Sequence, residues 1–240
     1  MFDINFIAYA INKRSTNYED FLIPFTFFAL INNDNSYVEI IVLNKKKFIL
    51  NYKSEIETLK KINNNFLIRE PQYKLNNHIN NTYRFFEKPT INSSYTYICD
   101  IDVMILDNIL PKFKKNWTNN LCYNNIIRNY NCSKKDMRLT GCHLVETKKY
   151  YTTNFLKIQE KYYNLNKNIN DEVILKNMCE EIHGLPSSNF KFRPIYGIHF
   201  SPNRGNNKKI SLITKKSYKD KFNKLINNYP NISNFKIFKN

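Results

Sequence analysis

The sequence predicts an α/β protein with a mostly parallel central sheet and helices on its faces. Apolar runs rich in β-branched and aromatic residues, typical of buried strands, occur at Phe6–Ala10, Val38–Leu43 and Tyr95–Cys99. Between them, apolar residues recur at helical spacing over Phe21–Ala29 and Glu55–Ile62. Each connection is therefore long enough for the crossover that parallel strands require. With 42% hydrophobic residues, the chain of 240 residues can bury a full core.

Local signals mark the elements of the first 90 residues. Pro24 lies inside the first helical pattern, so that helix starts near it or is kinked by it. Ser54 and Glu57 have the spacing of a capping box at the start of the second helix. Phe66–Ile68 is a short strand candidate, and Asn81–Glu87 is predicted to form one or two helical turns.

Two carboxylates follow the predicted strand Tyr95–Cys99, within the stretch Tyr95–Leu106. Alternate residues of an extended chain share a face, so Asp100 and Asp102 would point the same way with Ile101 turned into the core. In parallel sheets, ligands bind beyond the carboxyl ends of the strands. Two converging carboxylates suit a hard divalent cation, Mg²⁺ or Mn²⁺. The alternative is a pair of acids that cap the next element or pair with Lys or Arg.

The second half of the chain alternates strand and helix signals less regularly. Asn170 is a favourable N-cap for a helix over Asp171–Ile182. His143 lies in an apolar run and is interpreted as structural. The remaining candidates are strands at Leu121–Ile127, Cys142–Thr147 and Phe192–Phe200, and helices at Tyr150–Tyr163 and Tyr218–Asn227.

Charge and cysteine content suggest partners and a compartment. The net charge of +17 favours phosphate-bearing or polyanionic partners, or an anionic membrane surface. From Asn206 onward there are nine Lys against one Asp, which predicts a basic C-terminal extension over residues 206–240. Five scattered cysteines without a CxxC pair are typical of a reducing cytoplasm. The N-terminus has no signal-peptide pattern, so we expect a cytoplasmic protein whose basic end contacts the inner face of the membrane.

In this order, the motifs of the chain resemble the nucleotide-sugar glycosyltransferases of the GT-A fold, most nearly the family 8 type. The likeness rests on the first strand, on a short helix with Arg84 before the Asp100-Ile101-Asp102 triplet, and on Leu139-Thr140-Gly141. It continues with Asp171 at a helix start and with Ile198-His199-Phe200. The sequence departs from the family pattern at Leu139, Glu172 and Pro202, and the usual Lys-Pro-Trp run is missing.

The resemblance implies a single GT-A-like domain over residues 1–205. Its Rossmann-like, nucleotide-sugar-binding half would span residues 1–106 and its acceptor half residues 107–205. The implied reaction is the metal-dependent transfer of a sugar from a nucleotide-sugar, with a UDP-sugar favoured, to a glycan or lipid-linked glycan. Synthesis of a surface polysaccharide is the expected setting.

The resemblance also assigns roles to individual residues. Asp102 would be the principal ligand of Mn²⁺ or Mg²⁺, with Asp100 shared between the metal and the ribose, and with His199 as third ligand through a neutral ring nitrogen. Asp171 would bind the acceptor hydroxyl or act as general base. Binding of the nucleotide-sugar itself falls to Ala8, Tyr9, Arg84, Arg204 and Lys208.

Each of these residues also has a plainer interpretation. His199 could be a core histidine satisfied by the backbone, and Arg84 a surface cation on a short helix. An acid at the position of Asp171 is favoured by the helix dipole alone.

Two other functional classes stay open. A haloacid-dehalogenase-like phosphatase also carries Asp-x-Asp after a strand, with the first Asp as nucleophile, but usually near the start of its domain. A non-catalytic nucleic-acid-binding protein would fit the net charge and the many aromatic residues. Most of those aromatic residues lie in apolar runs, as core residues do, and we therefore expect no nucleic-acid partner.

Overall fold

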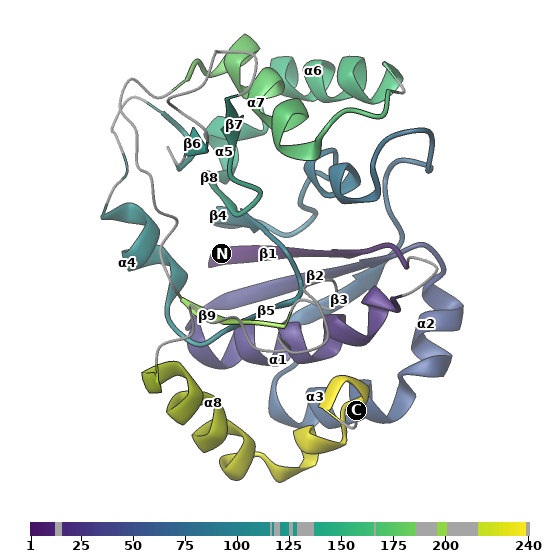
Figure 1. Ribbon diagram of the computed structural model, residues 1–240, viewed down its shortest axis with the longest axis vertical. Coiled ribbons are helices and arrows are strands. Elements are labelled where there is room, and N and C mark those ends of the chain that lie inside the picture. The colour runs from purple at the N-terminus through teal and green to yellow at the C-terminus, as the bar shows by residue number, and fades with distance from the viewer. Residues whose placement is uncertain are drawn as a thin grey trace. The chain divides into compact units, whose positions relative to one another are not determined.

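The computed structural model describes residues 1–12, 16–115, 117, 121–124, 127–128, 137–165, 167–185, 196–200 and 216–238. It is a mixed α/β structure with a mostly parallel central sheet flanked by helices, as the sequence predicts (Figure 1). The five strands of that sheet lie in the order β3-β2-β1-β4-β8. They are β1 (Phe2–Ala10), β2 (Ser36–Val42), β3 (Phe66–Arg69), β4 (Ser93–Ile98) and β8 (His143–Glu146).

Strand direction follows from the connections. β1 pairs in parallel with β4, and β2 pairs in parallel with β3. Helical segments lie between the members of each pair, and such crossovers are what parallel strands need. β8 instead runs antiparallel to β4, with Ile98 opposite His143. The alternation of elements that predicts the parallel strands does not predict this antiparallel strand.

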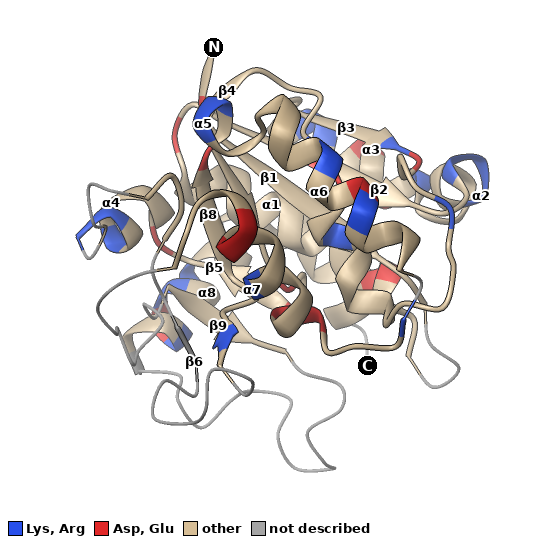
Figure 2. Cartoon of the chain, turned by 90° about the horizontal axis from the view of Figure 1, so that it is seen from above, with Lys and Arg blue, Asp and Glu red and all other residues tan. Residues whose placement is uncertain are grey.

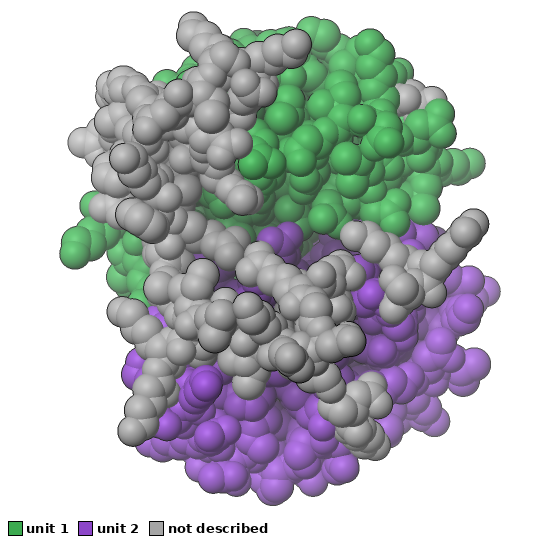
Figure 3. All heavy atoms as spheres, viewed as in Figure 1, with its two compact units in different colours: residues 1–7, 71–99, 110–194 green, residues 8–70, 100–109, 195–240 purple. Residues whose placement is uncertain are grey.

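The chain divides into two compact units, coloured separately in Figure 3. Unit 1 comprises residues 1–7, 71–99 and 110–194, and unit 2 comprises residues 8–70, 100–109 and 195–240. Each unit is therefore assembled from three separate segments of chain. This division does not follow the segments 1–106, 107–205 and 206–240, and the domain organisation inferred from the sequence stays a prediction.

In unit 2, the helix α1 is largely buried. α1 (Leu22–Asn32) packs against β2 and β5 (Val103–Ile105), and Pro24 lies in its first turn, where the missing N–H costs no hydrogen bond. The other helical elements of residues 8–70 are η1 (Tyr18–Phe21), α2 (Lys45–Asn51) and α3 (Lys53–Ile62).

The predicted capping box at Ser54 is wrong. α3 starts at Lys53, and its N-cap residue is Tyr52, which makes no side-chain cap. The reason is α2, which the sequence pattern missed: it ends at Asn51, so the chain enters α3 already helical. The side-chain cap of this region belongs to Asn44, whose Oδ1 accepts from the Lys47 N–H at 2.9 Å.

The C-terminal segment of unit 2 packs against α1. It consists of α8 (Lys216–Asn228) and the 3-10 helices η3 (Pro230–Asn234) and η4 (Lys236–Phe238). The ring of Phe222 stacks on Phe28 with centroids 5.3 Å apart, and Tyr229 meets Phe27 edge-on at 5.3 Å. The Lys236 N–H donates to Glu55 Oε1 at 2.9 Å. Residues 216–238 therefore contribute to the core of unit 2.

Unit 1 contains the antiparallel strand and two of the longer helices of the second half. Asn170 caps α7 (Asp171–Ile182) as predicted, because its side chain accepts from the N–H groups of Glu172 and Val173. The predicted helix at Tyr150–Tyr163 is two helices, because Thr152 caps a new one at Thr153. The remaining elements are η2 (Asn80–Phe85), α4 (Ile109–Lys114), β6 (Ile127–Arg128), β7 (Arg138–Leu139), α5 (Thr147–Tyr150) and α6 (Thr153–Asn164).

Two predicted strands fall partly outside the described residues. Of Leu121–Ile127, Tyr123 forms an isolated antiparallel bridge with Val145. Of Phe192–Phe200, the structure describes the part from Tyr196 onward, which contains β9 (Gly197–His199). None of the helices in the described ranges has the length and apolarity needed to cross a bilayer.

Candidate functional site

Asp102 and His199 lie together in unit 2. β4 ends at Ile98, a turn contains Asp102, and β5 starts at Val103. β5 pairs antiparallel with β9, and this register places Val103 opposite His199. As a result, Asp102 Oδ1 lies 3.0 Å from His199 Nε2. The Phe200 N–H also donates to the Asp102 carbonyl oxygen at 2.7 Å, which holds the two segments together next to the side chains.

A glycine makes this pairing possible. A Cβ on Gly197 would overlap the carbonyl oxygen of Met104 on β5, so a larger residue would push the two strands apart. A glycine inside a strand often marks such a close approach of another backbone. The steric need for glycine at this position fixes where His199 stands relative to Asp102.

The Asp102 side chain is suited to coordinate a cation. Its residue is 8% exposed, and Oδ1 has no hydrogen-bond partner among the described residues, because the contact with His199 lacks hydrogen-bond alignment. A buried carboxylate oxygen without a donor is costly unless a positive charge meets it. A carboxylate oxygen and an imidazole nitrogen at this distance are a donor set that Mn²⁺ accepts. Asp102 and His199 therefore fit a divalent cation.

Asp100 does not share a strand face with Asp102. The chain is extended only to Ile98 and then turns at Ile101 and Asp102, so the alternation expected for an extended chain does not apply. Within the described ranges, no three Asp, Glu, His or Cys side chains gather into a metal-binding group. A shared ion for Asp100, Asp102 and His199 stays a prediction.

The other residues assigned to the nucleotide-sugar have different positions. Ala8 and Tyr9 are buried in the second half of β1, in unit 2. Arg84 lies in η2, in unit 1. Arg204 and Lys208 fall outside the described residues.

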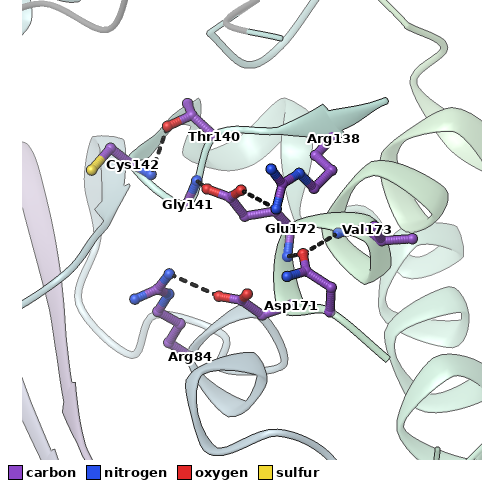
Figure 4. A network of polar contacts seen from close by, with 9 residues as sticks. Arg84, Arg138, Thr140, Gly141, Cys142, Asp171, Glu172 and Val173 are labelled. Carbon is purple, nitrogen blue, oxygen red and sulfur yellow. Dashed lines mark hydrogen bonds and ion pairs between the residues drawn. The ribbon is translucent and has the colours of Figure 1, made fainter. Parts of the chain in front are cut away.

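Arg84 and Asp171 form a buried ion pair in unit 1. Arg84 Nη2 lies 3.2 Å from Asp171 Oδ2, and the arginine is only 6% exposed (Figure 4). The interpretation of Arg84 as a surface cation is therefore wrong. Asp171 is the first residue of α7, where the helix dipole also stabilises a carboxylate. The ion pair and the helix start together fix the orientation of this side chain.

Glu172 holds the neighbouring turn in place. Its Oε1 accepts from the Gly141 N–H at 3.0 Å, and its Oε2 lies 3.7 Å from Arg138 Nη1 (Figure 4). A Cβ on Gly141 would lie 2.5 Å from Arg84 Nη2, so a larger residue there would displace the guanidinium. The structure thus brings together three of the segments that carry the resemblance, those around Arg84, Gly141 and Asp171.

Sequence reasoning misses the roles of Arg138 and Glu172. The polar, basic stretch Asn129–Arg138 predicts a loop, which is wrong at Arg138 because that residue begins β7. Glu172 is only a departure from the family pattern. Both contacts join segments far apart in the chain, and hydrophobic periodicity contains no signal for such pairs. The order of motifs along the chain is the sequence signal that could have indicated these contacts, because Gly141 and Asp171 both belong to the motifs that carry the resemblance.

A pocket of about 360 Å³ also lies in unit 2. Its walls come from the α2–α3 junction and from the C-terminal 3-10 helices. Its lining residues are Asn51, Tyr52, Ser54, Glu55, Thr58, Asn231, Asn234, Phe235 and Lys236. None of the residues predicted from the sequence to bind donor, metal or acceptor is among them.

No protein-family model matches the sequence, and no curated protein matches it at a significant level. Two solved structures of the glycosyltransferase GlyE from Streptococcus pneumoniae TIGR4 are similar in fold. The apo form is 11% identical, with a TM-score of 0.49 over 78% of this chain and 45% of that chain. The other is 12% identical, with a TM-score of 0.45 over 75% of this chain and 43% of that chain. The chain spans less than half of the length of each of these structures.

Proposed function

We propose that the chain is a metal-dependent glycosyltransferase that uses a nucleotide-sugar donor, with a UDP-sugar favoured. The acceptor would be a glycan or a lipid-linked glycan. The observation that carries this proposal is the contact between Asp102 and His199 at 3.0 Å, with a buried carboxylate oxygen that lacks a hydrogen bond among the described residues. The order of motifs in the sequence, which led to both residues independently, supports it.

The chemistry of the leaving group explains why such a site is needed. Transfer of a sugar from its nucleotide leaves a nucleoside diphosphate, so negative charge develops on the diphosphate. A bound Mn²⁺ or Mg²⁺ would neutralise that charge without any proton transfer. Asp102 and His199 would hold the ion, and Asp100 would complete the set or bind the ribose. Arg204 and Lys208 are proposed as further cations for the diphosphate.

Asp171 is the residue we propose for the sugar hydroxyls. An ionised carboxylate accepts hydrogen bonds from hydroxyl groups and can take a proton from one of them. The ion pair with Arg84 at 3.2 Å would orient it, and Glu172 would fix the adjacent turn through Gly141. Asp171 would then bind or deprotonate the acceptor hydroxyl, with Arg84 as its positioning residue.

Calorimetry with UDP and GDP tests the metal site. We expect either nucleotide to bind with Mn²⁺ present and to lose affinity in EDTA, because Asp100 and Asp102 repel a diphosphate that no cation bridges. His199→Ala should weaken Mn²⁺ binding by about 10–100-fold, on the scale of a lost coordination partner. Asp34→Asn, which removes an exposed carboxylate of the same unit, is the matched control and should change nothing.

The outcomes separate a ligand from a core histidine. If His199→Ala lowers the melting temperature of the metal-free protein and leaves Mn²⁺ affinity intact, His199 is structural. Equal nucleotide affinity with and without EDTA would contradict the metal site as a whole. Activity is read from the metal-dependent release of nucleoside diphosphate across a panel of nucleotide-sugars, with Asp102→Asn as the inactive reference.

A further inference from the structure

The outer side of α2 in unit 2 carries exposed lysines and exposed apolar side chains together. Lys45, Lys46 and Lys47 are exposed at its start. Leu50 is 76% exposed and Ile49 is 39% exposed. Leu43, just before the helix, is 41% exposed. A single exposed apolar side chain is ordinary on a protein surface, but three within eight residues, beside exposed lysines, indicate an interaction surface.

The inner side of α2 fixes its orientation. Phe48 is buried, and its ring packs on Tyr52 with centroids 4.5 Å apart. The Tyr52 hydroxyl donates to Asp20 Oδ1 at 2.6 Å, which ties the end of the helix to the rest of the unit. Lys46 and Leu50 are four residues apart and therefore share the face opposite Phe48. The contacts of Phe48 and Tyr52 thus hold α2 so that the face with Lys46 and Leu50 points away from the unit.

The sequence of α2 and α3 is strongly basic, and the Glu70 carboxylate accepts from the Lys45 N–H at the start of α2. From Lys45 to Lys61 there are six lysines and two glutamates. One of these, Glu55, is buried and accepts from the Lys236 N–H. Figure 2 shows lysine along α2. A surface that combines several lysines with exposed leucine and isoleucine matches an anionic lipid bilayer, where ammonium groups meet headgroup phosphates and apolar side chains enter the interface.

The basic C-terminal helix lacks this combination. Lys219, Lys221 and Lys224 are exposed on α8. Its apolar side faces α1 through Phe222, and none of its described large apolar residues is exposed. α8 can attract anionic lipid by charge alone, whereas α2 can also insert side chains.

We propose that unit 2 binds anionic membranes through α2. Lys45, Lys46 and Lys47 contact the lipid phosphates, and Leu50 and Ile49 enter the interface. We thus assign the contact to α2 in preference to α8, the described helix of the basic end to which the sequence alone assigned it. Membrane binding at this surface is independent of the proposed transfer reaction.

Co-sedimentation with vesicles of phosphatidylcholine, with and without phosphatidylglycerol, tests the proposal. We expect the protein to bind only the anionic vesicles. Replacement of Lys45, Lys46 and Lys47 by Gln should weaken binding by about tenfold or more. Leu50→Ser should weaken it by about fivefold, because an inserted apolar side chain is lost.

Two variants serve as matched controls. Replacement of Lys157, Lys219 and Lys224 by Gln removes the same net charge from exposed positions elsewhere. Leu75→Ser removes a leucine that is 43% exposed in unit 1. Both should bind anionic vesicles as the unmodified chain does. All the substituted side chains are exposed, so thermal unfolding should be unchanged and a folding defect is readily recognised.

Three results would overturn the proposal. The first is no binding to anionic vesicles at low salt. The second is equal weakening by the control lysine variant, which would mean attraction by net charge alone. The third is full vesicle binding by Leu50→Ser together with tight, lysine-dependent binding of a random oligonucleotide. In that case the surface would be a site for nucleic acid.

Discussion

His143 shows how one buried side chain links stability to pH. It lies on β8 between the rings of Tyr123 and Tyr150, with centroids 5.1 Å and 5.4 Å away. Its Nε2 is 3.9 Å from the Sγ of Cys179. Burial, with a smaller contribution from the charge of His183, lowers the pKa of His143 to about 3. The ring is therefore neutral in the folded protein at neutral pH, as expected of a structural histidine.

We expect unit 1 to lose stability as the pH falls below about 6.5, the ordinary pKa of histidine. Between that pH and about 3, His143 is protonated in the unfolded chain and neutral in the folded protein. This group alone contributes a slope of up to about 1.4 kcal/mol per pH unit. Urea unfolding at a series of pH values should show a flatter dependence in His143→Asn. Parallel curves for the two proteins would contradict the assignment.

The pairing of β5 with β9 is the element on which the candidate metal site depends. Gly197→Ala should force the strands apart at Met104, because the added methyl group overlaps backbone atoms that cannot move aside by a side-chain rotation. We expect a loss of roughly 1–3 kcal/mol of stability, typical of overpacking. Mn²⁺ binding should weaken as well, since His199 moves away from Asp102.

Gly184→Ala is the control for this prediction. Gly184 has a φ of 75°, so alanine there is strained by roughly 1–2 kcal/mol, but no atom lies within 4 Å of the added Cβ. It follows α7 in unit 1. Both variants should be less stable, and only Gly197→Ala should change metal affinity. Unchanged Mn²⁺ binding in Gly197→Ala would show that the strand pairing does not position His199.

At the scale of the whole molecule, the C-terminal segment belongs to the core of unit 2. Phe27 and Phe28 on α1 are fully buried and make ring contacts with Tyr229 and Phe222. Removal of residues 216–240 should therefore destabilise the protein by roughly 3–5 kcal/mol or more, the scale of losing buried aromatic contacts. Thermal unfolding of the truncated chain measures this, and an unchanged melting temperature would contradict it.

A charge-only variant separates packing from electrostatics at this end of the chain. Lys219 and Lys224 are exposed, so replacing both by Gln removes charge and leaves the ring contacts in place. This variant should unfold at the temperature of the unmodified chain. The basic composition after Asn206 suggests an extension. Composition gives the net charge of a segment, but it does not show which face of a helix packs against the core.

The sequence by itself determined the elements whose signals are local. Burial on both faces makes the strands around Phe6, Ile40 and Tyr97 nearly continuous apolar runs, and all three form. The cap at Asn170 needs only its own side chain and the next two N–H groups, so the start of α7 was also predictable. The α/β class follows from the alternation of these elements.

Only the tertiary structure decided which distant segments meet. The contact of Asp102 with His199 depends on the register of β5 and β9, and the pairing of Arg84 with Asp171 joins residues 87 positions apart in the chain. The turn that separates Asp100 from Asp102 interrupts a run whose composition is typical of one strand. Register and turns of this kind are set by long-range backbone pairing and by steric fit between segments. Periodicity within one segment has no information about either.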